Sequence, residues 1–159
     1  MVTLPRHAGA AGSGLEAVMG ERPAAGHRSV SHTADVRIES WAPSREHCVV
    51  EAVAAMVGNF AEVSGAVPTT TVRFRAGPGP DADLLVAVLD EVIYLIDTTG
   101  RLPVAAQAEA GDGSLDVRLS MVDAGRAELV GAVPKGVSLH DLRFGREGVG
   151  WSCSVTIDV

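Results

Sequence analysis

Residues 81–100 read DADLLVAVLDEVIYLIDTTG, and the predicted fold rests on the helix that this stretch forms. Apolar residues recur in it at helical spacing and form a broad stripe, which consists of Leu85, Val88, Leu89, Val92, Ile93 and Ile96. We expect Asp81 to cap this helix and Gly100 and Pro103 to end it. The width of the stripe indicates a helix that is buried against a sheet.

A second helix is predicted at residues 45–63. Ser44 is in place as its N-cap, and Val49, Val53 and Phe60 recur at helical spacing among alanines. The remaining patterns are typical of strands, because β-branched residues alternate with polar ones between Gly-containing turns. The predicted strands span residues 28–39 with a turn at 32–35, then 69–75, 104–110, 115–121, roughly 133–142, and 151–159.

Runs of strands with only two helices favour an α+β fold over a doubly wound parallel one. We expect a two-layer sandwich, in which both main helices cover one face of a mostly antiparallel β-sheet. Gly148 and Gly150 make the last two strands a hairpin. Residues 1–26 lack a sustained period and are predicted to be a flexible N-terminal extension. Residues 27–159 then form a single domain.

Composition limits the possible functions. The net charge of −7, with Lys135 as the only lysine, argues against strong direct nucleic-acid binding, which depends on clustered basic residues. No apolar run is long enough for a membrane span, and no secretory signal is recognisable, so a soluble cytoplasmic protein is expected. Cys48 and Cys153 lack CxxC spacing and are predicted to be buried free thiols.

Catalytic signatures such as a nucleophile elbow, a Walker A loop or a dinucleotide-binding glycine motif are absent from the sequence. Two aspartates stand out instead. Asp35 follows a turn at a strand junction, and Asp158 lies in the last predicted strand. Each also has a purely structural interpretation: Asp35 as an Asx turn, and Asp158 as one of the polar residues of a half-exposed strand. His32 and His140 have equally plain interpretations as hydrogen-bonded loop or strand residues.

Three segments resemble the archease family, and the resemblance covers about residues 28–159. The segments are residues 32–36 (HTADV), residues 89–100 (LDEVIYLIDTTG) and residues 155–159 (VTIDV). Lys135 and His140 also fall at positions that carry Lys and His in the family. The chain departs from the family pattern at Asp90, where asparagine is usual, at Val88, where tryptophan is common, and at Pro134 in an expected strand.

The resemblance implies an accessory protein rather than an enzyme. Archeases activate an RtcB-type RNA ligase in tRNA splicing and RNA repair, promoting its guanylylation and multiple turnover. The resemblance implies that the metal ligands of the family correspond to Asp35, Asp158 and a main-chain or terminal oxygen of Val159 in this chain. These hard oxygen ligands suit Ca²⁺, or alternatively Mg²⁺ or Mn²⁺. His32, Lys135 and His140 become candidate contacts to the ligase.

Two alternatives are open at this point. A chaperone-like or scaffold module would recognise several partners through its sheet face, and its carboxylates would be structural. A metal-dependent hydrolase would use Asp35 and Asp158 around a cation that activates water, but the sequence shows neither a further base nor a substrate pocket. The sequence leaves the oligomeric state open.

Overall fold

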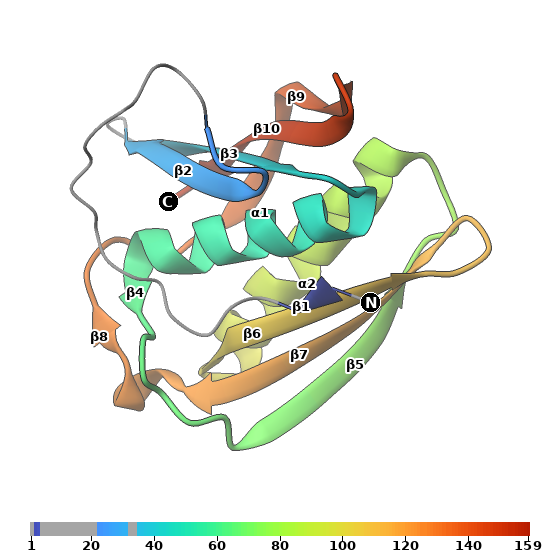
Figure 1. Ribbon diagram of the computed structural model, residues 1–159. Coiled ribbons are helices and arrows are strands. Elements are labelled where there is room, and N and C mark those ends of the chain that lie inside the picture. Colours follow the sequence, from blue (N-terminus) through green and yellow to red (C-terminus); the bar gives the residue numbers. More distant parts are fainter. Residues whose placement is uncertain (1, 4–21, 32–34) are drawn as a thin grey trace.

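Two antiparallel sheets enclose two helices in the computed structural model, which describes residues 2–3, 22–31 and 35–159 (Figure 1). One sheet has the strand order β1-β6-β7-β5 and the other β2-β3-β10-β9, while β4 and β8 form a separate short pair. The strands are β1 (Val2–Thr3), β2 (Gly26–Ser31), β3 (Asp35–Ala42), β4 (Ala61–Glu62), β5 (Thr70–Ala76), β6 (Arg101–Ala110), β7 (Leu115–Asp123), β8 (Glu128–Leu129), β9 (Gly136–Glu147) and β10 (Gly150–Asp158).

Helix α1 (Arg45–Phe60) begins where the sequence predicts, because the Ser44 side chain accepts a hydrogen bond of 3.2 Å from the His47 N–H. The predicted end at residue 63 is wrong. The chain turns into strand β4 directly after Phe60, and β4 pairs with β8. The ladder hydrogen bonds of that short pair replace the last helical turn.

Helix α2 (Asp81–Thr99) ends at Gly100 in the left-handed conformation, as predicted. The N-cap is Pro80 rather than Asp81, which is the first helical residue and accepts a hydrogen bond of 2.8 Å from Arg45. A carboxylate is favourable in that first turn because of the helix dipole. Pro103 does not terminate the helix either. It lies within β6, next to a register shift where the missing N–H is tolerated.

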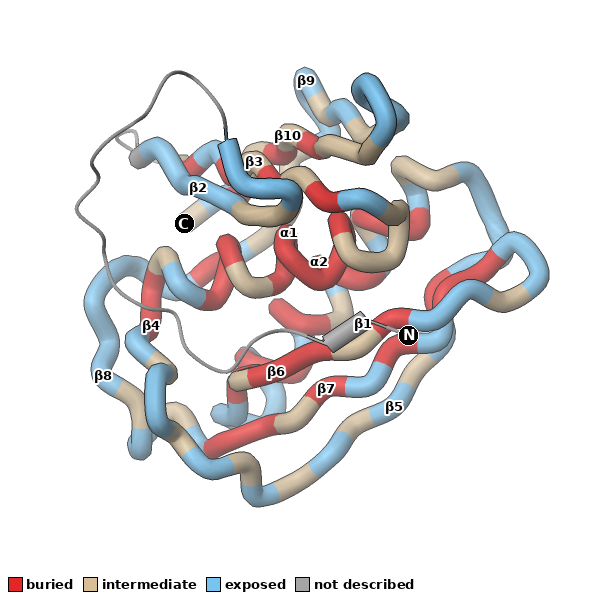
Figure 2. The backbone as a smooth tube through the Cα atoms, viewed as in Figure 1, coloured by how far each residue is buried: buried red, intermediate tan, exposed pale blue. Residues whose placement is uncertain are grey.

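Helix α1 is buried on both sides because it lies between the two sheets (Figure 2). Its buried residues include Cys48 and Val53, which are five positions apart and therefore point to different sides of the helix. Leu85 and Leu89 of α2 are also fully buried, as the broad apolar stripe predicts. The core therefore fills the space between the two sheets, and the outer face of each sheet is open to solvent.

The α+β class, the two helices and the antiparallel pairing are confirmed. The strands divide into two sheets, however, so α1 is covered on both sides and α2 contacts strands of both sheets, instead of both helices lying on one face of a single sheet. β9 and β10 form the predicted hairpin. β9 begins at Gly136, after Pro134, which therefore lies outside the strand.

The predicted extension 1–26 falls largely outside the described residues. Within it, Val2–Thr3 pair with β6, and Gly26 opens β2. None of the described helices is long and apolar enough to cross a membrane.

Candidate functional site

Asp35 and Asp158 lie directly opposite each other at the ends of two neighbouring strands. Asp35 opens β3, Asp158 closes β10, and the antiparallel register pairs the two residues. Because side chains alternate along a strand, the buried neighbours Val36 and Ile157 fix both carboxylates on the outer face. Opposed side chains of this kind have Cβ atoms about 5 Å apart. We call this pair the acidic corner.

Core packing and a backbone hydrogen bond fix the chain around the acidic corner. The side chain of Val159 packs against the core, so the chain remains anchored past Asp158. The N–H of Lys135 donates a hydrogen bond of 2.7 Å to the Asp158 carbonyl oxygen. On the neighbouring strand, Gly136 faces Asp158, and a Cβ atom there would lie 4.0 Å from its Oδ2. The glycine leaves room beside this carboxylate.

Two like charges placed opposite each other destabilise a sheet unless something neutralises them. No ion pair within the described part of the chain involves Asp35 or Asp158. Carboxylate oxygens are the ligands that Ca²⁺ and Mg²⁺ prefer, so the pair fits a divalent cation. The described residues contain no group of three His, Cys, Asp or Glu side chains suited to a metal. Further ligands would have to be main-chain oxygens, water or partner groups.

The other predicted site residues are placed differently. His32 lies outside the described residues. Lys135 is exposed and joins the acidic corner through its backbone N–H. His140 belongs to a protrusion of β9, because residues 139–142 lie opposite the single residue Val155. Its imidazole contacts the Asp141 carboxylate at 3.2 Å and is 86% exposed. The structure thus brings Asp35, Asp158 and the Lys135 backbone together and leaves His140 outside this group.

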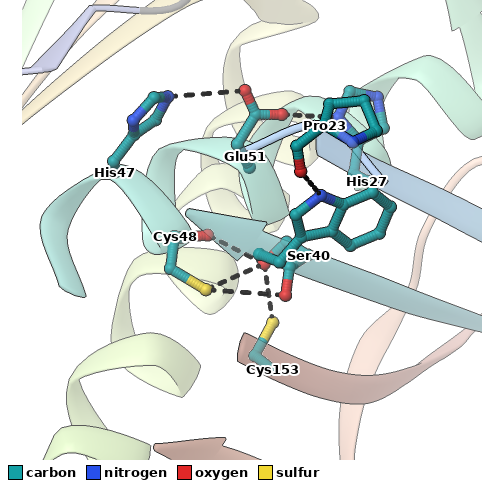
Figure 3. A network of polar contacts seen from close by, with 8 residues as sticks. Pro23, His27, Ser40, His47, Cys48, Glu51 and Cys153 are labelled. Carbon is teal, nitrogen blue, oxygen red and sulfur yellow. Dashed lines mark hydrogen bonds and ion pairs between the residues drawn. The ribbon is translucent and has the colours of Figure 1, made fainter. Parts of the chain in front are cut away.

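Both cysteines are buried free thiols, as predicted (Figure 3). The Ser40 hydroxyl donates a hydrogen bond of 2.9 Å to the Cys48 carbonyl oxygen, and it lies 2.9 Å from the Cys153 Sγ. The hydrogen bond with Cys153, together with burial, raises the pKa of the Cys48 thiol. Cys48 is therefore an uncharged thiol that helps join α1 to the sheet above it.

A buried carboxylate that the sequence analysis missed lies between two imidazoles (Figure 3). Glu51 of α1 is 5% exposed and contacts His27 Nδ1 at 2.7 Å and His47 Nε2 at 3.7 Å. His47 and Glu51 are four residues apart on one helix, and this spacing alone predicts that their side chains are neighbours. His27 comes from β2, and no sequence pattern points to that contact. The group ties β2 to α1 and is separate from the acidic corner.

Comparison with known proteins identifies the family. The model of the Archease protein family (MTH1598/TM1083) matches residues 27–159. The chain belongs to the archease family. It is 50% identical over 134 residues to the probable protein archease of two Mycobacterium tuberculosis strains, covering 84% of this chain and 75% of the relative. It is 30% identical over 139 residues to the protein archease of Archaeoglobus fulgidus, covering 84% of this chain and 98% of that relative.

A solved archaeal structure has the same fold. The solution structure of Methanobacterium thermoautotrophicum protein 1598 superposes with a TM-score of 0.68 at 18% identity, covering 84% of this chain and 99% of that one. The family that residues 32–36, 89–100 and 155–159 indicated is therefore confirmed, over almost the predicted range of the chain.

Proposed function

We propose that this archease is an accessory protein that activates an RtcB-type RNA ligase in tRNA splicing and RNA repair. It would promote guanylylation of the ligase and its multiple turnover, while the ligase itself holds the catalytic groups. The observation that carries the proposal is the register that places Asp35 opposite Asp158 on an open sheet face. Family membership supports the accessory role.

The acidic corner would hold a divalent cation, Ca²⁺ first, with Mg²⁺ or Mn²⁺ as alternatives. Asp35 and Asp158 supply carboxylate oxygens, and a main-chain oxygen of Val159 completes the protein's own set. A bound cation supplies positive charge that can meet phosphate oxygens at a partner's active site. The residues of this chain fix the position of that charge. The Lys135 N–H and the anchored Val159 side chain keep the end of β10 from moving away from β3.

The location of the acidic corner suits docking. Asp158 is exposed, and the corner lies at the end of a sheet rather than in an enclosed cavity. A set of two carboxylates leaves coordination positions of a six- to eight-coordinate cation free for groups of a partner. Lys135 and His140, both exposed, remain the predicted contacts to the ligase around it.

Multiple-turnover RNA joining by the RtcB-type ligase of the same organism tests the proposal. The reaction contains GTP and metal, and it is run with no archease, with wild type, and with the variants Asp35→Asn and Glu109→Gln. Glu109 is the matched control, because it also faces a carboxylate, Asp116, across two strands of the other sheet. We expect stimulation by wild type and by the Glu109 variant, and loss of stimulation with the Asp35 variant. Absence of stimulation by folded wild type would refute the accessory role.

A further inference from the structure

A groove with a volume of about 570 Å³ lies on the outer face of β3, β10 and β9. These three strands lie side by side in the sheet opposite the β5–β7 layer (Figure 1). The floor of the groove is formed by β10, whose outward residues are Ser152 and Ser154, and the same outward row continues with Thr156 and Asp158. Because these hydroxyl side chains are short and those of the neighbouring strands are long, the middle strand is recessed.

Arginines stand on both sides of this row of hydroxyls. Arg143 on β9 is opposite Ser154, and Arg37 on β3 is opposite Thr156. Residues that face each other across adjacent strands share one face, so both guanidinium groups lie on the same side of the sheet as the hydroxyls. Arg146 also lines the groove, but it is opposite Trp151, so its guanidinium lies on the other face of the sheet, 5.5 Å from the centre of the Trp151 ring.

The carboxylates of the groove already have cationic partners. Glu39 contacts Arg28 at 2.6 Å and Arg37 at 3.5 Å. Glu147 contacts Arg22 at 3.1 Å. The pKa of the Glu147 carboxyl is lowered, mainly by a hydrogen bond from Ser152 and also by the hydrogen bond from Arg22. Each acidic side chain is therefore neutralised by a neighbour.

Arg143, in contrast, makes no ion pair within the described part of the chain. The groove thus has an excess of positive charge, although the whole chain carries a net charge of −7. A guanidinium beside hydroxyl donors suits the oxygens of a phosphate group.

The groove leads to the acidic corner. Asp158 is six positions beyond Ser152 along β10, which corresponds to roughly 20 Å of extended chain. A cation held by Asp35 and Asp158 would complete a row of phosphate-binding groups along one strand. The row is long enough for more than a single phosphate, which favours a polymeric ligand over a free ion.

We propose that this groove binds the phosphate groups of a single-stranded RNA whose terminal phosphate lies at the acidic corner. The choice of RNA rests on the proposed function, whereas the phosphate chemistry rests on Arg143, Arg37 and the hydroxyls of β10. The contacts are to the backbone of the strand, so they position it without reading its sequence. The net charge of the rest of the chain opposes RNA, so the affinity is weak and confined to the groove.

The experiment measures fluorescence anisotropy of a short labelled oligoribonucleotide with a 3′-phosphate, titrated with the full chain at low salt, with calcium and without ligase. The variant is Arg143→Gln. Its matched control is Arg126→Gln, because Arg126 is also exposed and without an ion pair among the described residues. We expect the Arg143 variant to bind roughly 3- to 10-fold more weakly and to lose about one unit of salt slope, and the Arg126 variant to bind like wild type.

Competition with inorganic phosphate distinguishes the two sources of phosphate. If the RNA strand is the ligand, unlabelled oligoribonucleotide displaces the probe at far lower concentration than inorganic phosphate does. Equal displacement by both would overturn the proposal in favour of a free-phosphate site. Equal binding by wild type and the Arg143 variant, or no binding by wild type, would also overturn it.

The outcome is independent of the activation assay, since no ligase is present. Stimulated RNA joining without RNA binding would leave the proposed function intact and remove the groove inference. RNA binding without stimulated RNA joining would leave the groove inference intact and remove the proposed function. A melting temperature of the Arg143 variant equal to that of wild type shows that any loss of binding is not caused by unfolding.

Discussion

Replacing Asp35 by asparagine should stabilise the metal-free protein and at the same time abolish its stabilisation by a divalent cation. The substitution keeps the shape of the side chain and removes one of two like charges that face each other across β3 and β10. The two effects have opposite signs, so a purely structural role of the carboxylate cannot produce both. The comparison therefore tests the acidic corner without requiring the ligase.

The magnitude follows from the separation of the charges. Two unit charges roughly 5 Å apart repel by about 0.8 kcal/mol in water, and this value applies because Asp158 is exposed. Asp35→Asn should remove this repulsion in the absence of metal. A cation present at about 100 times its dissociation constant stabilises wild type by about 2.7 kcal/mol. For a chain of this size, each kcal/mol changes the melting temperature by about 3 °C.

Thermal unfolding is measured with a chelator and again with calcium, for wild type, Asp35→Asn and Glu109→Gln. With the chelator we expect the Asp35 variant to melt about 2 °C above wild type. With calcium the order should reverse, because only wild type gains several degrees. The Glu109 variant relieves a similar pair of opposed carboxylates, but its partner Asp116 is held by Arg75 at 2.9 Å. Because Glu109 and Asp116 lie in the other sheet, the Glu109 variant should keep the full calcium response.

Two results would refute this reasoning. A calcium response of the Asp35 variant equal to that of wild type would show that the cation binds elsewhere. A metal-free Asp35 variant that is less stable than wild type would show that the carboxylate makes a stabilising contact, as an Asx turn would.

Three further substitutions test the packing and the charges. Gly131→Ala places a Cβ atom 2.5 Å from the Asn59 carbonyl oxygen and should cost about 1–3 kcal/mol in urea unfolding, while Gly125→Ala, with open space around it, should be nearly neutral. Ser40→Ala removes the buried hydroxyl that donates a hydrogen bond to the Cys48 carbonyl oxygen and should cost about 1 kcal/mol in the same assay. Partial burial raises the pKa of Asp90, so its ionisation opposes folding: Asp90→Asn should be slightly stabilising at neutral pH, and this gain should disappear as the pH falls below the ordinary value of 3.8.

Local residue patterns were sufficient to predict the helices and most of their ends. The apolar stripe of residues 85–96 places α2, Ser44 fixes the start of α1, and Gly100 the end of α2. Each depends on residues within a few positions of one another, so the physics of a single turn or helix is sufficient. The two aspartates were singled out by the family's motifs, since nothing in their local patterns requires a site.

The way in which these elements meet could not be predicted from local patterns. The division of the strands into two sheets, the pairing of Asp35 with Asp158, and the contact of His27 with Glu51 all join residues that are distant in sequence. Alternation along a strand says which side chains share a face, but not which strand edges pair or in which register. That choice is made when α1, whose buried residues lie on opposite sides of the helix, is covered by both sheets at once, because one sheet could cover only one side of it.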